Sequence, residues 1–96
     1  MTVSVTLTCE LATESLDALQ HFLAANLSNV RGFEGGQRVS ILFDQNNQNM
    51  LIDEDWQSVS AHKSYMQFIE QNGVLAELAS FFKRPPTINY YFPTNL

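Results

Sequence analysis

The spacing of hydrophobic residues alternates between two periods along this chain, and the order of those periods constrains the fold more than any other feature. In the segment VSVTLTCE, apolar side chains recur at every second position, at Val3, Val5, Leu7 and Cys9. A period of two with β-branched residues predicts a strand with one apolar face. The next apolar residues follow helical spacing, at Leu16, Leu19, Leu23, Leu27 and Val30, with Phe22 beside them. Thr13 or Ser15 is expected to cap this helix, and Gly32 is expected to end it in the left-handed conformation.

A β-hairpin is predicted in the middle of the chain. Residues 33–43 predict a strand, in which Gly35 and Gly36 indicate a bulge or a close approach of the backbone. The polar run DQNNQN at 44–49 predicts a turn, so a third strand at 50–56 would pair with the second.

The last third of the chain predicts helical structure and a closing strand. Ser58 is expected to cap a helix that Asn72-Gly73 interrupts. A second helical piece is expected over 74–84, with Lys83 and Arg84 at its negative end. Two prolines follow, and the segment TINYYF at 87–92 predicts the fourth strand.

The order of these elements predicts an α+β class, a ferredoxin-like βαββαβ arrangement with a four-stranded antiparallel sheet. Residues 1–96 are expected to form a single domain. Charged residues make up 16% of the chain, below the ~25% usual for soluble domains. We expect the sheet face without helices to carry apolar and aromatic residues. Two copies of the chain are therefore expected to pair as a homodimer, sheet against sheet.

Charge and composition argue against several classes of partner. The net charge is −5, and the five cations are scattered, so neither nucleic acid nor an anionic membrane is an expected partner. Cys9 is the single cysteine, and His21 and His62 lie in different predicted helices, so no metal site is expected. The N-terminal segment does not resemble a secretion signal and no apolar run reaches the ~18 residues of a membrane span. A cytoplasmic location is expected.

Candidate site residues gather where the third strand meets the next helix. Strand alternation places Glu54 on the same face as Trp56, and Asp53 and Asp55 on the other. A carboxylate beside an indole could bind an aromatic substrate, with a raised pKa. The alternative is that Trp56 fills the core and Glu54 pairs with a nearby cation. His62 lies one turn into the helix and could shuttle protons, or it could be a hydrogen-bonded structural residue.

The segment from Asp53 onward resembles the antibiotic biosynthesis monooxygenase domain family. The resemblance covers nearly the whole chain. It rests on the Gly-aromatic run VRGFEGG, the closing strand PPTINYYF, and Glu54, Trp56, Ser58, Ala61, His62, Tyr65, Gly73, Leu75 and Leu78.

The resemblance implies a dimeric α+β barrel with a pocket between each sheet and its helices. It also implies a monooxygenase that acts on a small aromatic phenol or quinol without metal, flavin, haem or other cofactor. Its catalytic residues would be Trp56, His62 and Tyr65, and Glu54 and Phe68 would join them in the substrate pocket. The first strand lacks the asparagine of the haem-degrading branch, which argues against that activity. The alternative is a non-catalytic dimeric protein of the same fold that binds a small molecule.

Overall fold

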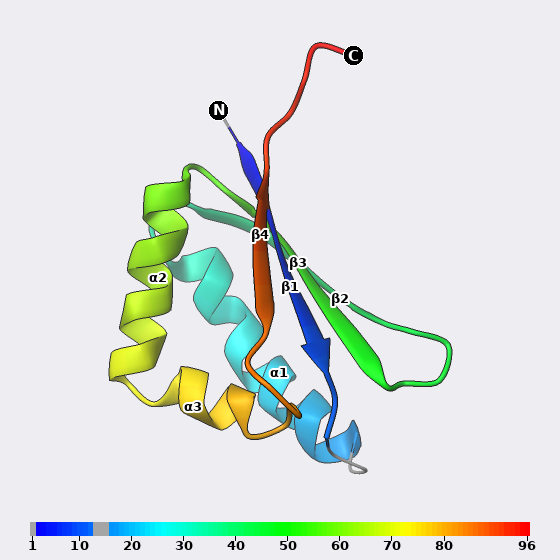
Figure 1. The fold of residues 1–96 in the computed structure, drawn as a ribbon. Coiled ribbons are helices and arrows are strands. Elements are labelled where there is room, and N and C mark those ends of the chain that lie inside the picture. Colours follow the sequence, from blue (N-terminus) through cyan, green and yellow to red (C-terminus); the bar gives the residue numbers. More distant parts are fainter. Residues whose placement is uncertain (1, 13–15) are drawn as a thin grey trace.

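The computed structural model describes residues 2–12 and 16–96, which form four strands and three helices (Figure 1). In chain order the elements are β1 (Val3–Glu10), α1 (Leu16–Gly32), β2 (Gly36–Phe43), β3 (Asn49–Trp56), α2 (Val59–Gln71), α3 (Val74–Ala79) and β4 (Thr87–Tyr91). The expected caps of α1, Thr13 and Ser15, lie outside the described residues. This order confirms the predicted α+β, ferredoxin-like class.

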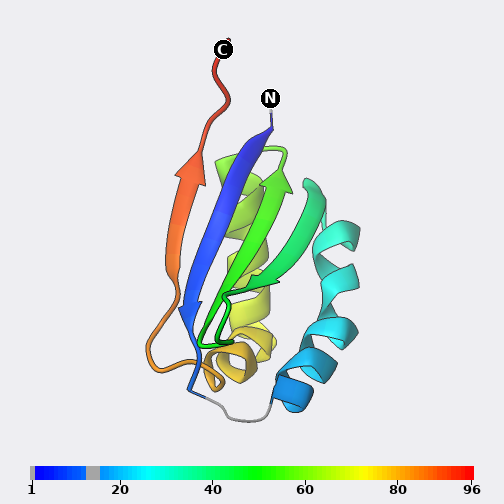
Figure 2. The ribbon, with the colours of Figure 1, turned by 90° about the vertical axis from the view of Figure 1, so that its right-hand side faces the viewer.

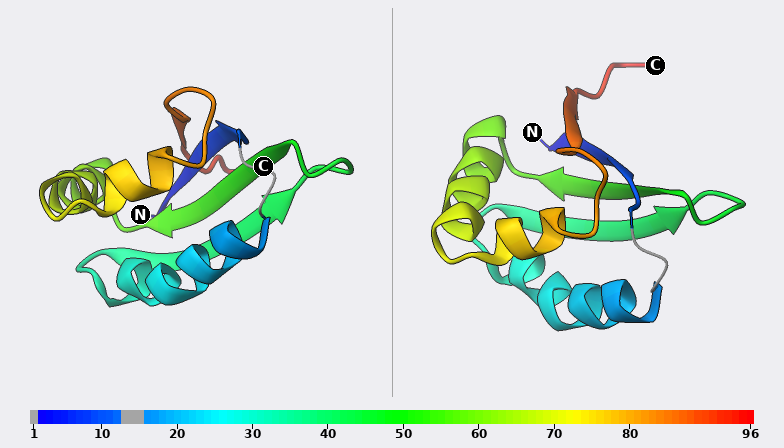
Figure 3. Two further views of the ribbon diagram at one scale, coloured as in Figure 1. Left: turned by 90° about the horizontal axis from the view of Figure 1, so that it is seen from below. Right: turned by 60° about the horizontal axis from the view of Figure 1, so that its bottom comes forward.

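The four strands form one antiparallel sheet in the order β2-β3-β1-β4. All three helices cover the same face of that sheet (Figures 2 and 3). In the strand register, Val5 of β1 lies opposite Glu54 of β3 and Tyr90 of β4, and Glu54 also lies opposite Val39 of β2. Residues that lie opposite one another share a face. One row of side chains, with Glu54 in it, therefore crosses the sheet beneath the helices.

The core lies between this face and the helices. The inward residues of β1 are all buried, as alternation predicts, and so are Met50, Ile52, Glu54 and Trp56 of β3. Leu19, Leu23 and Val30 of α1 close the core from one side, and the buried face of α2 closes it from the other. No helix in the described part of the chain is long and apolar enough to cross a membrane.

The turn between α1 and β2 differs from the prediction. Gly32 is the last residue of α1 and does not have a positive φ, whereas Gly35 does, with φ 91°. The left-handed position therefore falls three residues later than expected, and β2 begins at Gly36 rather than at Phe33. The predicted bulge is confirmed, because the pairing of β2 with β3 shifts between Gly36 and Arg38.

The segment after α3 also differs from the prediction. The helix ends at Ala79, so Lys83 and Arg84 lie beyond its last turn. The chain there pairs with the end of β1, since the Lys83 amide donates to the Glu10 carbonyl at 2.8 Å. Arg84 instead forms an ion pair with the Glu10 carboxylate, also at 2.8 Å.

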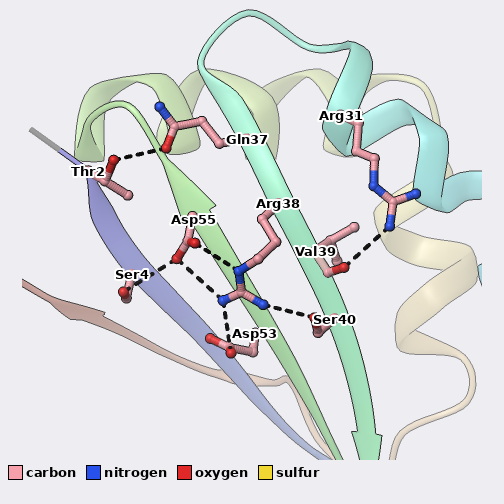
Figure 4. A network of polar contacts seen from close by, with 9 residues as sticks. All are labelled: Thr2, Ser4, Arg31, Gln37, Arg38, Val39, Ser40, Asp53 and Asp55. Carbon is pink, nitrogen blue, oxygen red and sulfur yellow. Dashed lines mark hydrogen bonds and ion pairs between the residues drawn. The ribbon is translucent and has the colours of Figure 1, made fainter.

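The uncovered face of the sheet is more polar than expected. Arg38 on the edge strand β2 extends over β3 and donates to Asp53, Asp55 and Ser40 at 2.8–3.3 Å (Figure 4). Serine and threonine side chains of β1 lie beside this network, and the apolar residues on the face are Leu42, Leu51 and Tyr91. The face carries the expected apolar and aromatic residues at only a few positions, because alternation directs nearly all large apolar side chains inward. Pairing of two copies through this face stays a prediction.

Candidate functional site: a buried carboxyl beside an apolar cavity

The acidic run Asp53-Glu54-Asp55 divides between the two faces of the sheet. Asp53 and Asp55 point outward and share Arg38, which holds the pKa of Asp55 below its usual value. Glu54 points toward the helices and is only 4% exposed. No lysine or arginine is paired with Glu54 among the described residues, so the expected alternative of a cation partner is wrong. Alternation on β3 thus isolates one carboxyl in the core.

Trp56 supplies the shortest hydrogen bond to this carboxyl. The two residues are two positions apart on β3, so their side chains lie on the same face. The indole Nε1 of Trp56 donates to Oε1 of Glu54 at 2.7 Å. Trp56 itself is fully buried, and its ring packs against those of His62 and Tyr65 at centroid distances of 5.5 and 5.2 Å.

His62 approaches the same carboxyl from α2. Ser58 caps this helix as predicted, because its side chain accepts the amide of Ala61 at 3.0 Å. One turn further, Nε2 of His62 lies 3.6 Å from Oε1 of Glu54. The other ring nitrogen, Nδ1, lies 2.9 Å from the hydroxyl of Tyr90 on β4. Tyr90, His62, Glu54 and Trp56 therefore form a row of neighbouring polar groups, which we call the Glu54 chain.

Burial sets the charge states in the Glu54 chain. Desolvation raises the pKa of Glu54 from 4.5 to about 7, partly offset by the indole hydrogen bond and reinforced by the charge of Asp53. Desolvation lowers the pKa of His62 from 6.5 to about 4. At neutral pH the imidazole is therefore uncharged and the carboxyl is close to half ionised. The pair at 3.6 Å is not a salt bridge under those conditions.

Tyr65 is the second titratable group beside Glu54. Burial, with the nearby charge of Glu54, raises the pKa of its phenol to about 12. This hydroxyl therefore stays protonated at any physiological pH and can donate a hydrogen bond but cannot accept a proton. Its ring packs edge-on against Phe33 at 5.3 Å.

A small cavity lies between the sheet and the three helices. Its volume is about 50 Å³, which is room for a water molecule or two, since each occupies about 30 Å³ in the liquid. Much of its wall is apolar, including Leu7, Leu23, Val39, Ile52, Ile69 and Leu78. Among its described lining residues the polar ones are Asn26, Glu54 and Tyr65. Asn26 already donates to the Phe22 carbonyl of its own helix at 2.8 Å, so Glu54 is the ionisable acceptor that faces the cavity.

The predicted pocket residues divide into three groups. Glu54 and Tyr65 line the cavity. Trp56 and His62 contact Glu54 but do not line the cavity, since they lie 0% and 1% exposed behind it. Phe68 is 47% exposed, packs against Phe33 at a centroid distance of 5.5 Å, and does not line this cavity. Phe68 lies at the margin of the buried face of α2 that His62, Tyr65 and Ile69 form.

Sequence reasoning missed Tyr90 and the residues of α1 and α3 in the cavity wall. Tyr90 and Tyr91 are adjacent on a strand, and only the register with β1 shows which one faces the helices. Alternation alone puts Ile88 and Tyr90 on one face and Asn89 and Tyr91 on the other, but it does not show which face meets the helices. In the described part of the chain, no three histidine, cysteine or acidic side chains come together in a way that could hold a metal ion.

Comparison with known proteins identifies the fold. No family model and no curated protein matches the sequence. Among solved structures, Rv0793 from Mycobacterium tuberculosis aligns with a TM-score of 0.81 at 16% identity, over 100% of this chain and 98% of that one. A Bordetella bronchiseptica protein, provisionally named an antibiotic biosynthesis monooxygenase, aligns with a TM-score of 0.85 at 13% identity, over 97% of each chain.

A third structure, named an antibiotic biosynthesis monooxygenase, aligns with a TM-score of 0.82 at 11% identity, over 96% of this chain and 98% of that one. At these identities the likeness extends to the backbone and not to individual site residues. The chain has the fold of the solved antibiotic biosynthesis monooxygenase proteins along nearly its whole length.

Proposed function

We propose that this protein is a monooxygenase that works without metal, flavin or haem on a small phenol or quinol held between the sheet and the helices. The observation that carries the proposal is a single carboxyl in the wall of a mostly apolar cavity. The shared fold with proteins named antibiotic biosynthesis monooxygenases supports the same class of reaction.

The chemistry of phenols explains why such a cavity would suffice. An electron-rich phenol reacts with oxygen far more readily once its hydroxyl proton is removed, so the protein must supply a base and a dry environment. Glu54, with its pKa of about 7, is half ionised at neutral pH and can accept such a proton. Trp56 and His62 would act from behind the cavity wall, by fixing the position of that carboxyl.

The size of the cavity constrains the substrate. A benzene ring needs a cavity of about 150 Å³, three times the volume present. Substrate must therefore enter by displacing lining side chains, among which Met66 is the most adaptable. Widening costs packing energy, so single-ring phenols are expected to react faster than polycyclic ones.

Oxygen consumption with a panel of phenols and quinols tests the proposal. Asn26→Phe would place a ring at the cavity wall and is expected to slow oxygen uptake about tenfold or more, an effect of ~1.4 kcal/mol on the barrier. Ala25→Phe is the matched control, because Ala25 is the neighbouring residue on α1 and faces solvent. Equal rates for the two variants would place the reaction elsewhere. Ligands that raise the melting temperature of the wild type without any oxygen uptake would favour the alternative, a non-catalytic binding protein.

A further inference from the structure

We propose that Glu54 is the base that takes the hydroxyl proton of the bound phenol, and that Tyr90 and His62 adjust to both protonation states of Glu54. This inference rests on the proposed ligand class and deepens it. It moves the role of proton acceptor from His62 and Tyr65, which the sequence favoured, to the carboxyl that faces the cavity.

Burial argues against one of the two other candidates, and charge state against the other. His62 is 1% exposed, does not line the cavity, and is separated from it by Glu54. Tyr65 lines the cavity but keeps its own proton at physiological pH. Oε1 of Glu54 already accepts the indole hydrogen of Trp56 at 2.7 Å, so the carboxylate keeps its second oxygen for a ligand hydroxyl.

Tyr90 and His62 can serve the carboxyl in either state. When Glu54 is ionised, the Tyr90 hydroxyl can donate to Nδ1, which leaves the imidazole hydrogen on Nε2, directed at Glu54. When Glu54 is protonated, Nδ1 can carry the hydrogen and donate to Tyr90, so Nε2 becomes an acceptor. The 3.6 Å separation is long for a hydrogen bond, and a movement of about half an ångström would close it. No charge has to appear on the buried ring in either arrangement.

The groups around Glu54 determine how this step depends on pH. His62 and Tyr65 face it from α2, Trp56 from β3 and Tyr90 from β4, whereas Val5 and Val39 flank it on β1 and β2. All of these are uncharged near neutral pH, and Asp53 on the opposite face adds a negative charge. The step breaks the O–H bond of the phenol and forms an O–H bond on Glu54, and the electron pair remains on the phenolate oxygen. One negative charge is shared between the two partners before and after transfer.

The charge balance predicts which phenols are ionised when they bind. A phenol with the ordinary pKa of about 10 would lose its proton to Glu54 only against a gradient of ~3 pK units, or about 4 kcal/mol. A phenol whose ring carries an electron-withdrawing substituent is more acidic, so the difference between its pKa and that of Glu54 is smaller. The site therefore selects for acidic phenols among ligands of equal size.

Binding of meta-nitrophenol without turnover tests the inference, because its neutral and ionised forms absorb at different wavelengths. The measurement is made one pH unit above the pKa of Glu54, where Glu54 is ionised and the free ligand is mostly neutral. Because meta-nitrophenol is a weaker acid than protonated Glu54, we expect a minor but measurable fraction of the ligand bound to the wild type to show the phenolate spectrum. In Glu54→Gln, which cannot accept a proton, we expect the bound ligand to keep the neutral spectrum.

Two further variants separate the named roles. Tyr65→Phe decides between the two titratable residues of the cavity, and loss of the phenolate spectrum in this variant alone would overturn the assignment of Glu54. Tyr90→Phe removes one hydroxyl and is expected to reduce the phenolate fraction without abolishing it; an unchanged fraction would remove Tyr90 from the proposal.

The outcomes also distinguish this inference from the proposed function. A neutral bound ligand in the wild type, or a phenolate in Glu54→Gln as well, would overturn the role of Glu54 while oxygen uptake could still be observed. Failure of the wild type to bind the phenol at all would overturn the ligand class, and with it both proposals.

Discussion

Replacing Glu54 by glutamine is expected to stabilise the folded chain by about 3 kcal/mol at any pH above 7. The pKa of this carboxyl rises from 4.5 in the unfolded chain to about 7 in the folded chain because burial penalises its charged form. At pH values between 4.5 and about 7 the folded state holds a proton that the unfolded state has released. The free energy of unfolding therefore falls as pH rises through this range. Glutamine keeps an oxygen for the indole of Trp56 and carries no charge.

His62 makes the free energy of unfolding depend on pH in the opposite direction. Its pKa is lowered from 6.5 to about 4, so between those values the unfolded state binds a proton that the folded state lacks. The free energy of unfolding therefore falls as pH falls through that range. In the wild type the two slopes nearly cancel between pH 4.5 and 6.5, and we expect little contribution from this pair to the pH profile there.

Single substitutions separate the two slopes. Glu54→Gln is expected to lose stability as pH falls from 6.5, whereas His62→Gln is expected to lose stability as pH rises from 4.5 toward 7. Each slope should approach ~1.4 kcal/mol per pH unit. Urea denaturation across this pH range measures both. Parallel profiles for the two variants would show that the buried pair does not have the assigned charge states.

Replacing Gly36 by alanine is expected to destabilise the chain by about 3 kcal/mol or more. An added Cβ would overlap the backbone carbonyl oxygen of Val30, and backbone atoms cannot move aside as a flexible side chain does. The Gly36 amide also donates to the Phe33 carbonyl at 2.9 Å, which fixes the turn. The bulge that sets the register of β2 against β3, and so the place of Val39 opposite Glu54, depends on this contact.

Gly32 offers a matched control for this substitution. It lies four residues earlier, at the end of α1, and an added Cβ there meets no atom within 4 Å. Alanine is expected to stabilise the helix by roughly 0.5–1 kcal/mol, because glycine loses more backbone entropy on folding. Thermal and urea denaturation of both variants measures the difference. Equal stabilities would mean that the turn can move without cost.

The sequence determined the fold because its apolar periods agree with one another along the chain. Alternation also placed Glu54 correctly beside Trp56 and away from the two aspartates, since the rule depends only on position along one strand. The end of α1 at Gly32 was predicted correctly, but the left-handed conformation was assigned to Gly32 and lies at Gly35, in the turn where Gly36 comes close to the Val30 carbonyl. The end of α3 was wrong because the segment after it pairs with β1 through Lys83.

The candidate site was only partly predictable for a related reason. Sequence spacing shows that His62 and Tyr65 share a helix face. How close each side chain comes to the cavity is set by the packing of α2 against the sheet. That packing hides His62 behind Glu54 and leaves Tyr65 at the cavity. Tyr90 could join them only through the β1–β4 register, which a single strand does not reveal. The volume of the cavity depends on every side chain in its wall and has no local signal.

The most direct test of the account is the titration of Glu54 itself. Carbon NMR of protein labelled at the glutamate side-chain carboxyl, with Glu54→Gln to assign the signal, measures its pKa in the folded chain. We predict a midpoint near pH 7 that moves when a phenol is added, because the ligand hydroxyl and the carboxyl share one proton. A midpoint near the ordinary value of 4.5, unaffected by phenol, would contradict the claim that Glu54 is a base that faces the substrate cavity.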